Sequence, residues 1–182
     1  MRTTSIEPAA PRRPFLWILV AGGLVLGLAW LLLVPPFESS DESAFYKEVP
    51  SYARGGPITI PPLYPAVLKP VIKLAGGSDR PFQAEYNPSF RFVSNRVGHV
   101  NMYMHGRAAG MLRADVNRMY LLRFVTLLMW LASLVLIFEI ARLFFGRGDL
   151  ALVTAGLCLA IPQFSFISSK IHAEATATLL AS

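Results

Sequence analysis

Two adjacent acidic residues, Asp41 and Glu42, are the strongest candidates for chemistry in this sequence. They follow the apolar run from Phe15 to Val34 by a few residues, so they would lie at the edge of a bilayer that this run crosses. A carboxylate at a bilayer edge is partly desolvated, which can suit it to accept a proton from a substrate. Glu174 is expected on the same side of the membrane. The alternative interpretation is that the pair is only the solvated start of a loop.

Basic and histidine residues form a second group of candidates. Arg123 lies near the expected outer end of an apolar run at 120–145, where its guanidinium could hold a lipid phosphate or reach the interface. Asn101 lies between His99 and His105, and we place Asn101 and His105 with Arg123 as candidate substrate- or carrier-binding residues. Histidines and carboxylates on one side could hold a divalent metal. Exposed loop histidines are far commoner, so we predict no cofactor and no metal ligands.

The elements that position these residues are predicted to be membrane helices. Hydrophobic residues make up 54% of the 182 residues, against about 45–50% in a soluble domain. The first apolar run has no charge and is longer than a signal-peptide core of about 7–15 residues, so we predict that it is retained. The predicted segments are 1–14 in the cytoplasm, transmembrane helices at 15–34, 120–145 and 150–169, an extracytoplasmic loop at 35–119, and the start of a truncated transmembrane helix at 175–182.

Charge around the first helix predicts its orientation. Positive residues favour the cytoplasmic side of a membrane, and three arginines precede this helix whereas three acidic residues follow it: Arg2, Arg12, Arg13, then Glu38, Asp41, Glu42. The N-terminus is therefore predicted to be cytoplasmic. The net charge of +6 includes no basic run longer than two residues, so we predict no nucleic-acid partner.

Smaller patterns predict local structure within these segments. Residues 43–54 and 61–75 are expected to form short amphipathic helices, the second of them lying at the membrane surface. Pro162 is expected to break the third membrane helix near its outer end. The eight residues from 175 cannot cross a bilayer, so we expect a fragment, a truncated gene product or a chain completed by another.

Two spacings predict contacts of the membrane helices. Gly23 and Gly27 are four residues apart, a spacing that allows two helices to approach closely, although glycine is also simply common in membrane helices. Glu139 and Arg142 are three residues apart, on one face of a helix, and are expected to pair.

Several short pieces of sequence occur in an order that is typical of one family. They are Pro-Pro-Phe-x-x-x-Asp-Glu at Pro35 to Glu42, Pro-Pro-Leu-Tyr at Pro61 to Tyr64, Asn87 to Phe92, Asn101 to Gly106, Leu121 to Thr126, Ile161 to Phe166, and then the acidic residue Glu174. With these pieces the chain resembles the N-terminal part of a bacterial family of polytopic membrane proteins of unassigned function. That family is itself similar to the GT-C glycosyltransferases, which use polyprenyl-phosphate sugars.

The resemblance implies a fold and a function. The fold would be an all-α, polytopic, GT-C-like transmembrane helical bundle in the bacterial inner membrane, with short interfacial helices in a large extracytoplasmic loop. The function would be transfer of a sugar from a polyprenyl-phosphate carrier to an extracytoplasmic acceptor. Asp41 would match an acidic residue that acts as catalytic base or orients a metal. With Asp41 as the base, Glu42 and Glu174 would support it, and Arg123 would bind the carrier phosphate. The alternative is a non-catalytic membrane protein that binds lipid-linked glycans or assists cell-envelope assembly.

Overall fold

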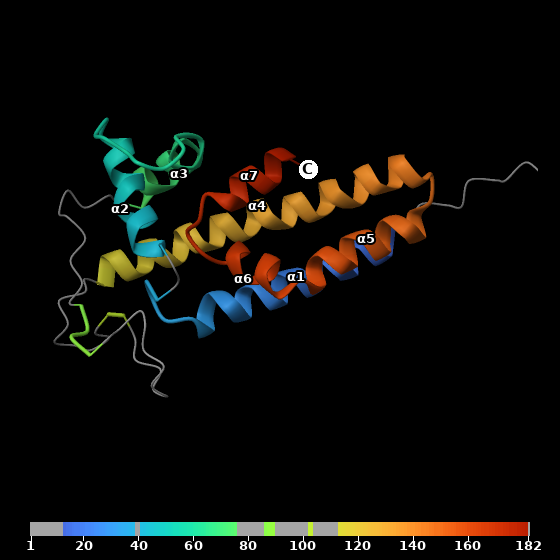
Figure 1. Ribbon diagram of the computed structural model, residues 1–182, viewed down its shortest axis with the longest axis horizontal. Helices are drawn as coiled ribbons and strands as arrows, with labels where there is room; N and C mark the ends of the chain where they lie inside the picture. Colours follow the sequence, from blue (N-terminus) through green and yellow to red (C-terminus); the bar gives the residue numbers. More distant parts are fainter. Residues whose placement is uncertain (1–12, 39–40, 76–85, 90–101, 104–112, 182) are drawn as a thin grey trace, which may run out of the picture.

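The computed structural model describes residues 13–38, 41–75, 86–89, 102–103 and 113–181 (Figure 1). Within these ranges the regular structure is helical, apart from one isolated bridge between Tyr86 and Tyr103. The expectation of an all-helical protein is confirmed for this part of the chain. The helices are α1 (Arg13–Leu33), α2 (Glu42–Ala53), α3 (Leu63–Leu74), α4 (Arg113–Phe145), α5 (Gly148–Ala160), α6 (Pro162–Ser168) and α7 (Glu174–Ala181).

Two of the described helices, α1 and α4, are long and apolar enough to cross a membrane. The apolar part of α1 spans Pro14–Leu33, close to the expected 15–34, and much of its apolar surface faces outward. An apolar surface of this extent suits contact with lipid. α4 begins at Arg113 rather than at 120, because its first turns are polar and their side chains pair with one another instead of ending the helix.

Four helices lie side by side along the long axis of the molecule: α1, α4, α5 and α7. Taken in chain order, each of these helices runs opposite to the previous one of the set (Figure 1). α1 approaches α4 closely at its glycines, since a Cβ on Gly23 would lie 3.2 Å from Leu131 and one on Gly27 would overlap Leu127. The predicted close contact is therefore confirmed. The predicted pair of Glu139 and Arg142 is also present, at 2.6 Å.

The third apolar segment consists of two helices rather than one. Ile161 leaves the helical conformation, with φ −72° and ψ 112°, and Pro162 then starts α6. Proline fits the first turn of a helix because the N–H that it lacks would have no partner there. The predicted break at Pro162 is confirmed, and the expected helix at 150–169 is replaced by α5, about 20 Å long, and the short α6.

The short helices α2 and α3 pack together at the end of the bundle where α1 ends and α4 begins (Figure 1). They correspond to the helices expected at 43–54 and 61–75. Their shared core contains the buried side chains of Tyr46, Tyr64 and Leu68, which also pack near Leu122 of α4. The pair of helices is thus fixed to the bundle rather than attached only through its linkers.

Two carboxylates anchor the segments around α2 and α3. Glu38 accepts hydrogen bonds from the backbone N–H groups of residues 102 and 103, at 2.6 and 2.9 Å. Glu48 accepts from the backbone N–H groups of residues 59 and 60, at 2.7 and 2.9 Å. Both acidic residues therefore hold backbone in place at this end of the bundle.

Candidate functional site

An ion pair between Glu42 and Arg123 lies at the centre of the candidate site. Glu42 is the first residue of α2, and Arg123 lies in the N-terminal half of α4. The Nε and one Nη of Arg123 donate to the two carboxylate oxygens of Glu42, each at 2.6 Å. Both side chains are 0% exposed. Such a two-pronged contact matches the planar guanidinium to the carboxylate and fixes their relative orientation.

Arg123 also binds the end of α1. Its Nη groups donate to the backbone carbonyls of Leu31, Val34 and Pro35, at 3.0, 2.8 and 3.0 Å. Carbonyls at a helix C-terminus lack partners within the helix, so a cation there satisfies them. A guanidinium has five N–H donors, and all five are engaged in this arrangement.

The carrier-binding role expected of Arg123 stays a prediction, and the structure gives this side chain protein partners. Its five donors already face protein acceptors, and the side chain does not reach the surface. Glu42 is equally buried, and its Oε1 accepts a further bond from the backbone N–H of Ile171 at 3.3 Å. The pair therefore joins α1, α2, α4 and the turn before α7. In this geometry both side chains hold these segments together.

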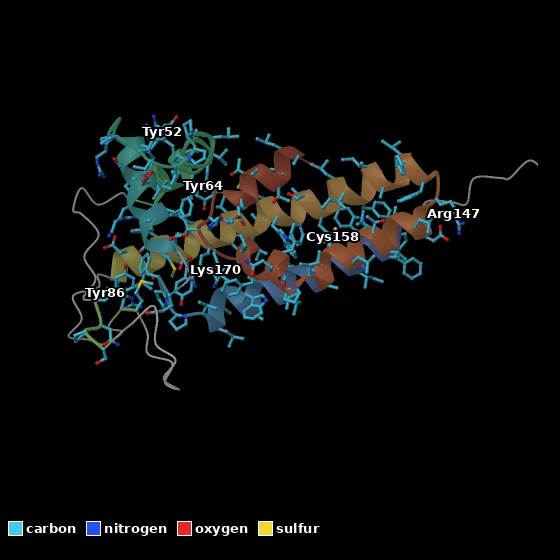
Figure 2. All side chains as sticks on the ribbon, viewed as in Figure 1. Tyr52, Tyr64, Tyr86, Arg147, Cys158 and Lys170 are labelled. Carbon is cyan, nitrogen blue, oxygen red and sulfur yellow. The ribbon has the colours of Figure 1, made fainter. Side chains whose placement is uncertain are left out.

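A second buried cation, Lys170, lies next to this pair. Its Nζ donates to the carbonyl of Trp30 at 3.3 Å and lies 5.2 Å from the ring centroid of Phe166. Figure 2 shows it in the half of the bundle where α2 lies, far from Arg147 at the opposite end. Burial and the nearby Arg123 guanidinium lower the pKa of Lys170 to about 7, against the opposing effect of Glu42. Our sequence analysis did not single out Lys170.

Asp41 differs from its neighbour Glu42 in the exposure of its side chain and in its backbone conformation. Its side chain is exposed, whereas its backbone carbonyl accepts the N–H of Phe45 at 3.0 Å in the first turn of α2. Its φ of 59° lies in the left-handed region, as does that of Phe37 at 62°. Residues held there cost about 1–3 kcal/mol and occur often at functional sites. Asp41 is thus an exposed carboxylate on a fixed, strained backbone.

A polar network between α2 and α4 also escaped our sequence analysis. The hydroxyl of Tyr46 donates to Asp115 Oδ1 at 2.8 Å, and Arg118 contacts both residues, at 3.3 and 3.2 Å. Burial and the bond to Asp115 raise the pKa of Tyr46 above its ordinary value. The spacing of Asp115 and Arg118, three residues apart on a helix, is a signal that could have predicted their pairing.

Glu174 is the first residue of α7 and lines a pocket between α4, α6 and α7. Its carboxylate lies 3.8 Å from Nδ1 of His172, whose ring contacts that of Phe45 at a tilt of 55°, with centroids 4.7 Å apart. Within the described residues no group of three potential metal ligands occurs. The candidates Asn101 and His105 lie outside the described residues, as does His99.

The geometry thus places Glu42 and Arg123 in one buried cluster and leaves Asp41 exposed beside it. Fixed backbone and an exposed carboxylate are features that a general base requires, but they do not by themselves name a reaction. Comparisons with models of protein families, with curated proteins and with solved structures found no match to this chain.

Proposed function

We propose that this chain is the N-terminal portion of a GT-C-like, multi-pass membrane glycosyltransferase, with its N-terminus in the cytoplasm. The enzyme transfers a sugar from a polyprenyl-phosphate carrier to an extracytoplasmic acceptor. The proposal is supported by the order of the sequence pieces from Pro35 to Glu174 and by two helices that can span a membrane. In this arrangement, the end of the bundle that carries α2 and α3 faces the outside of the bacterial inner membrane.

The observation that carries the proposal is that two neighbouring carboxylates differ in burial. Glu42 is buried against Arg123, so it fixes the start of α2 to α1 and α4. Asp41, directly before it, is exposed and held in a left-handed conformation. A catalytic group must be held close to its productive geometry by neighbours that are themselves fixed. The buried pair supplies that support to Asp41.

In the proposed reaction Asp41 acts as the general base. Its carboxylate takes the proton of the acceptor hydroxyl while that oxygen attacks the anomeric carbon of the donor sugar. The bond between this carbon and the carrier phosphate oxygen breaks, and polyprenyl phosphate leaves with the bonding electrons. Arg123 does not contact the phosphate in this scheme, since its donors bind Glu42 and the end of α1.

Replacing Asp41 tests the proposal in the full-length protein. Transfer from radiolabelled polyprenyl-phosphate sugars should fall by about 10²–10⁴-fold in Asp41→Asn, because the amide cannot take up the proton. Asp149→Asn is the matched control, since Asp149 is a half-exposed carboxylate in the first turn of α5, and α5 begins at the opposite end of the bundle (Figure 1). Asp41→Gly should also lose transfer without losing thermal stability, because glycine adopts the left-handed conformation freely. Near-normal transfer by Asp41→Asn would exclude this role.

One observation favours the second function, a non-catalytic protein that binds a lipid-linked glycan. Two of the three charged residues expected to assist Asp41, namely Glu42 and Arg123, are used to hold the structure. A binding protein would retain its glycan in Asp41→Asn and would show no transfer with any polyprenyl-phosphate sugar. Measuring glycan binding and transfer on the same preparations separates the two functions.

A further inference from the structure

A pocket of about 270 Å³ lies where the third apolar segment is broken. It is formed by residues from α4, from the residue between α5 and α6, from α6 itself, and from α7. Its largely apolar walls are Trp130, Ile161, Phe164, Ile167, Ala175 and Thr178. The rings of Trp130 and Phe164 contact each other, with centroids 5.3 Å apart and planes inclined at 52°. Ile161, where the segment leaves the helical conformation, is itself part of the lining.

Two polar side chains, Gln163 and Glu174, complete the lining of the pocket. Both are exposed, with 59% of the Glu174 side chain accessible. The lining residues include no lysine or arginine, so the one formal charge at the pocket is negative. An anionic headgroup would therefore be repelled here, whereas a primary ammonium could donate to the carboxylate of Glu174 and the amide oxygen of Gln163.

The surroundings of the pocket indicate that its ligand comes from the membrane. Ile161, in the lining, is 51% exposed, and Leu157 of α5 and Leu180 of α7 are 65% and 69% exposed. Exposed apolar side chains on the helices that form or adjoin the pocket suit contact with lipid. Sites for whole drug-sized ligands usually measure about 300–1,000 Å³, so a pocket of this size takes part of one acyl chain rather than a whole lipid.

We propose that this pocket binds a membrane lipid whose headgroup ends in a primary ammonium, with part of one acyl chain between Trp130 and Phe164 and the ammonium on Glu174. The proposal concerns a lipid site on α4, α6 and α7. It does not depend on transferase activity or on Asp41. Its chemistry distinguishes primary ammonium lipids from lipids with a quaternary ammonium, which has no N–H to donate, and from anionic lipids.

Trp130 provides a direct readout of lipid in the pocket. The full-length protein, with every other tryptophan changed to phenylalanine, is placed in nanodiscs that contain one brominated lipid at a fixed mole fraction. Bromine on the acyl chain quenches a tryptophan that it contacts. Brominated phosphatidylethanolamine should quench Trp130 at about two- to fivefold lower mole fraction than brominated phosphatidylcholine or phosphatidylglycerol, the range expected of an exposed ion pair.

Variants of Glu174 decide whether the headgroup is recognised as proposed. Glu174→Gln should abolish the preference for phosphatidylethanolamine, and Glu174→Lys should transfer it to phosphatidylglycerol. Glu139→Gln, the same change on a partly exposed residue of α4, should leave it intact. Ala175→Leu should fill the pocket and reduce quenching by all three lipids, since Ala175 is buried in the lining. Equal quenching by the three lipids in the protein with native Glu174, or a preference that survives Glu174→Lys, would overturn the proposal.

Discussion

The buried pair of Glu42 and Arg123 leads to a prediction about stability. Glu42→Gln preserves the shape of the side chain and removes its charge. The guanidinium of Arg123, which is fully buried, then faces an amide in place of the carboxylate that it binds through two 2.6 Å contacts. Removing one partner of a buried ion pair leaves the other charge uncompensated and costs about 3–5 kcal/mol. We therefore expect Glu42→Gln to lower the free energy of unfolding by about that amount.

The reciprocal change, Arg123→Met, should be at least as damaging. It strands the Glu42 carboxylate and also removes the donors that satisfy the carbonyls of residues 31, 34 and 35. A buried carbonyl that loses its donor costs about 1–3 kcal/mol. In the double variant Glu42→Leu with Arg123→Met the carbonyls still lose their donor, but no charge is stranded. The free energy of unfolding lost in the double variant should therefore be about 2–3 kcal/mol smaller than the sum of the losses in Glu42→Leu alone and Arg123→Met alone. This difference is at the upper end of couplings between contacting residues.

A partly exposed ion pair within α4 provides the control. Glu139 and Arg142 also meet at 2.6 Å, but their side chains are 32% and 30% exposed. Partly solvated pairs contribute about 0–1 kcal/mol, so Glu139→Gln should have a small effect. Reversible unfolding in mixed micelles, followed by circular dichroism, measures both variants under the same conditions. If Glu42→Gln also cost less than about 1 kcal/mol, the pair would not be buried as described, and the anchoring of Asp41 would lose its basis.

Three further measurements test other parts of the structure. Gly27→Ala should destabilise the contact of α1 with α4 by about 1–3 kcal/mol, whereas Gly22→Ala, with open space around the added Cβ, should be neutral or slightly stabilising. Because the pKa of Lys170 is about 7 in the folded chain and near its ordinary 10.5 when unfolded, the unfolded chain binds more protons between these pH values. Stability should therefore rise with pH across this window, by at most about 1.4 kcal/mol per unit, and Lys170→Met should remove the slope in unfolding experiments. In a variant without native cysteine, a cysteine at Lys47 should react with an impermeant maleimide in intact cells and one at Asp149 should not; the reverse pattern would invert the proposed topology.

Local sequence patterns predicted the helices well because their causes are local. Two long apolar runs became α1 and α4, since length and hydrophobicity alone mark a helix that can cross a membrane. Pro162 ended one helix and began another, because proline lacks the N–H that a helix interior needs. The start of α4 was placed too late, since its first turns are polar and their stability comes from pairing that hydrophobicity does not report.

The contacts of Arg123 could not be predicted because they depend on residues that are distant in the chain. Glu42 is 81 positions away, and the carbonyl of Leu31 is 92 positions away. Nothing near Arg123 distinguishes a guanidinium that binds phosphate from one that binds a carboxylate and a helix end. Lys170 did leave a local signal. It is the only lysine, arginine, aspartate or glutamate between Asp149 and Glu174. An isolated charged residue in an apolar stretch usually faces the protein interior and has a polar partner there.

The assignment of separate roles to Asp41 and Glu42 follows from the geometry of a helix. Glu42 begins α2, and the other buried residues of that helix are Phe45, Tyr46 and Val49. These four positions, i, i+3, i+4 and i+7, form one stripe on the face that packs against the protein. A carboxylate on that stripe is buried, and a buried carboxylate needs a cation as partner. Arg123 of α4 is that cation. Asp41 lies one position earlier, before the helix begins, and turns away from the stripe. The apolar stripe therefore commits Glu42 to structure and leaves the side chain of Asp41 exposed.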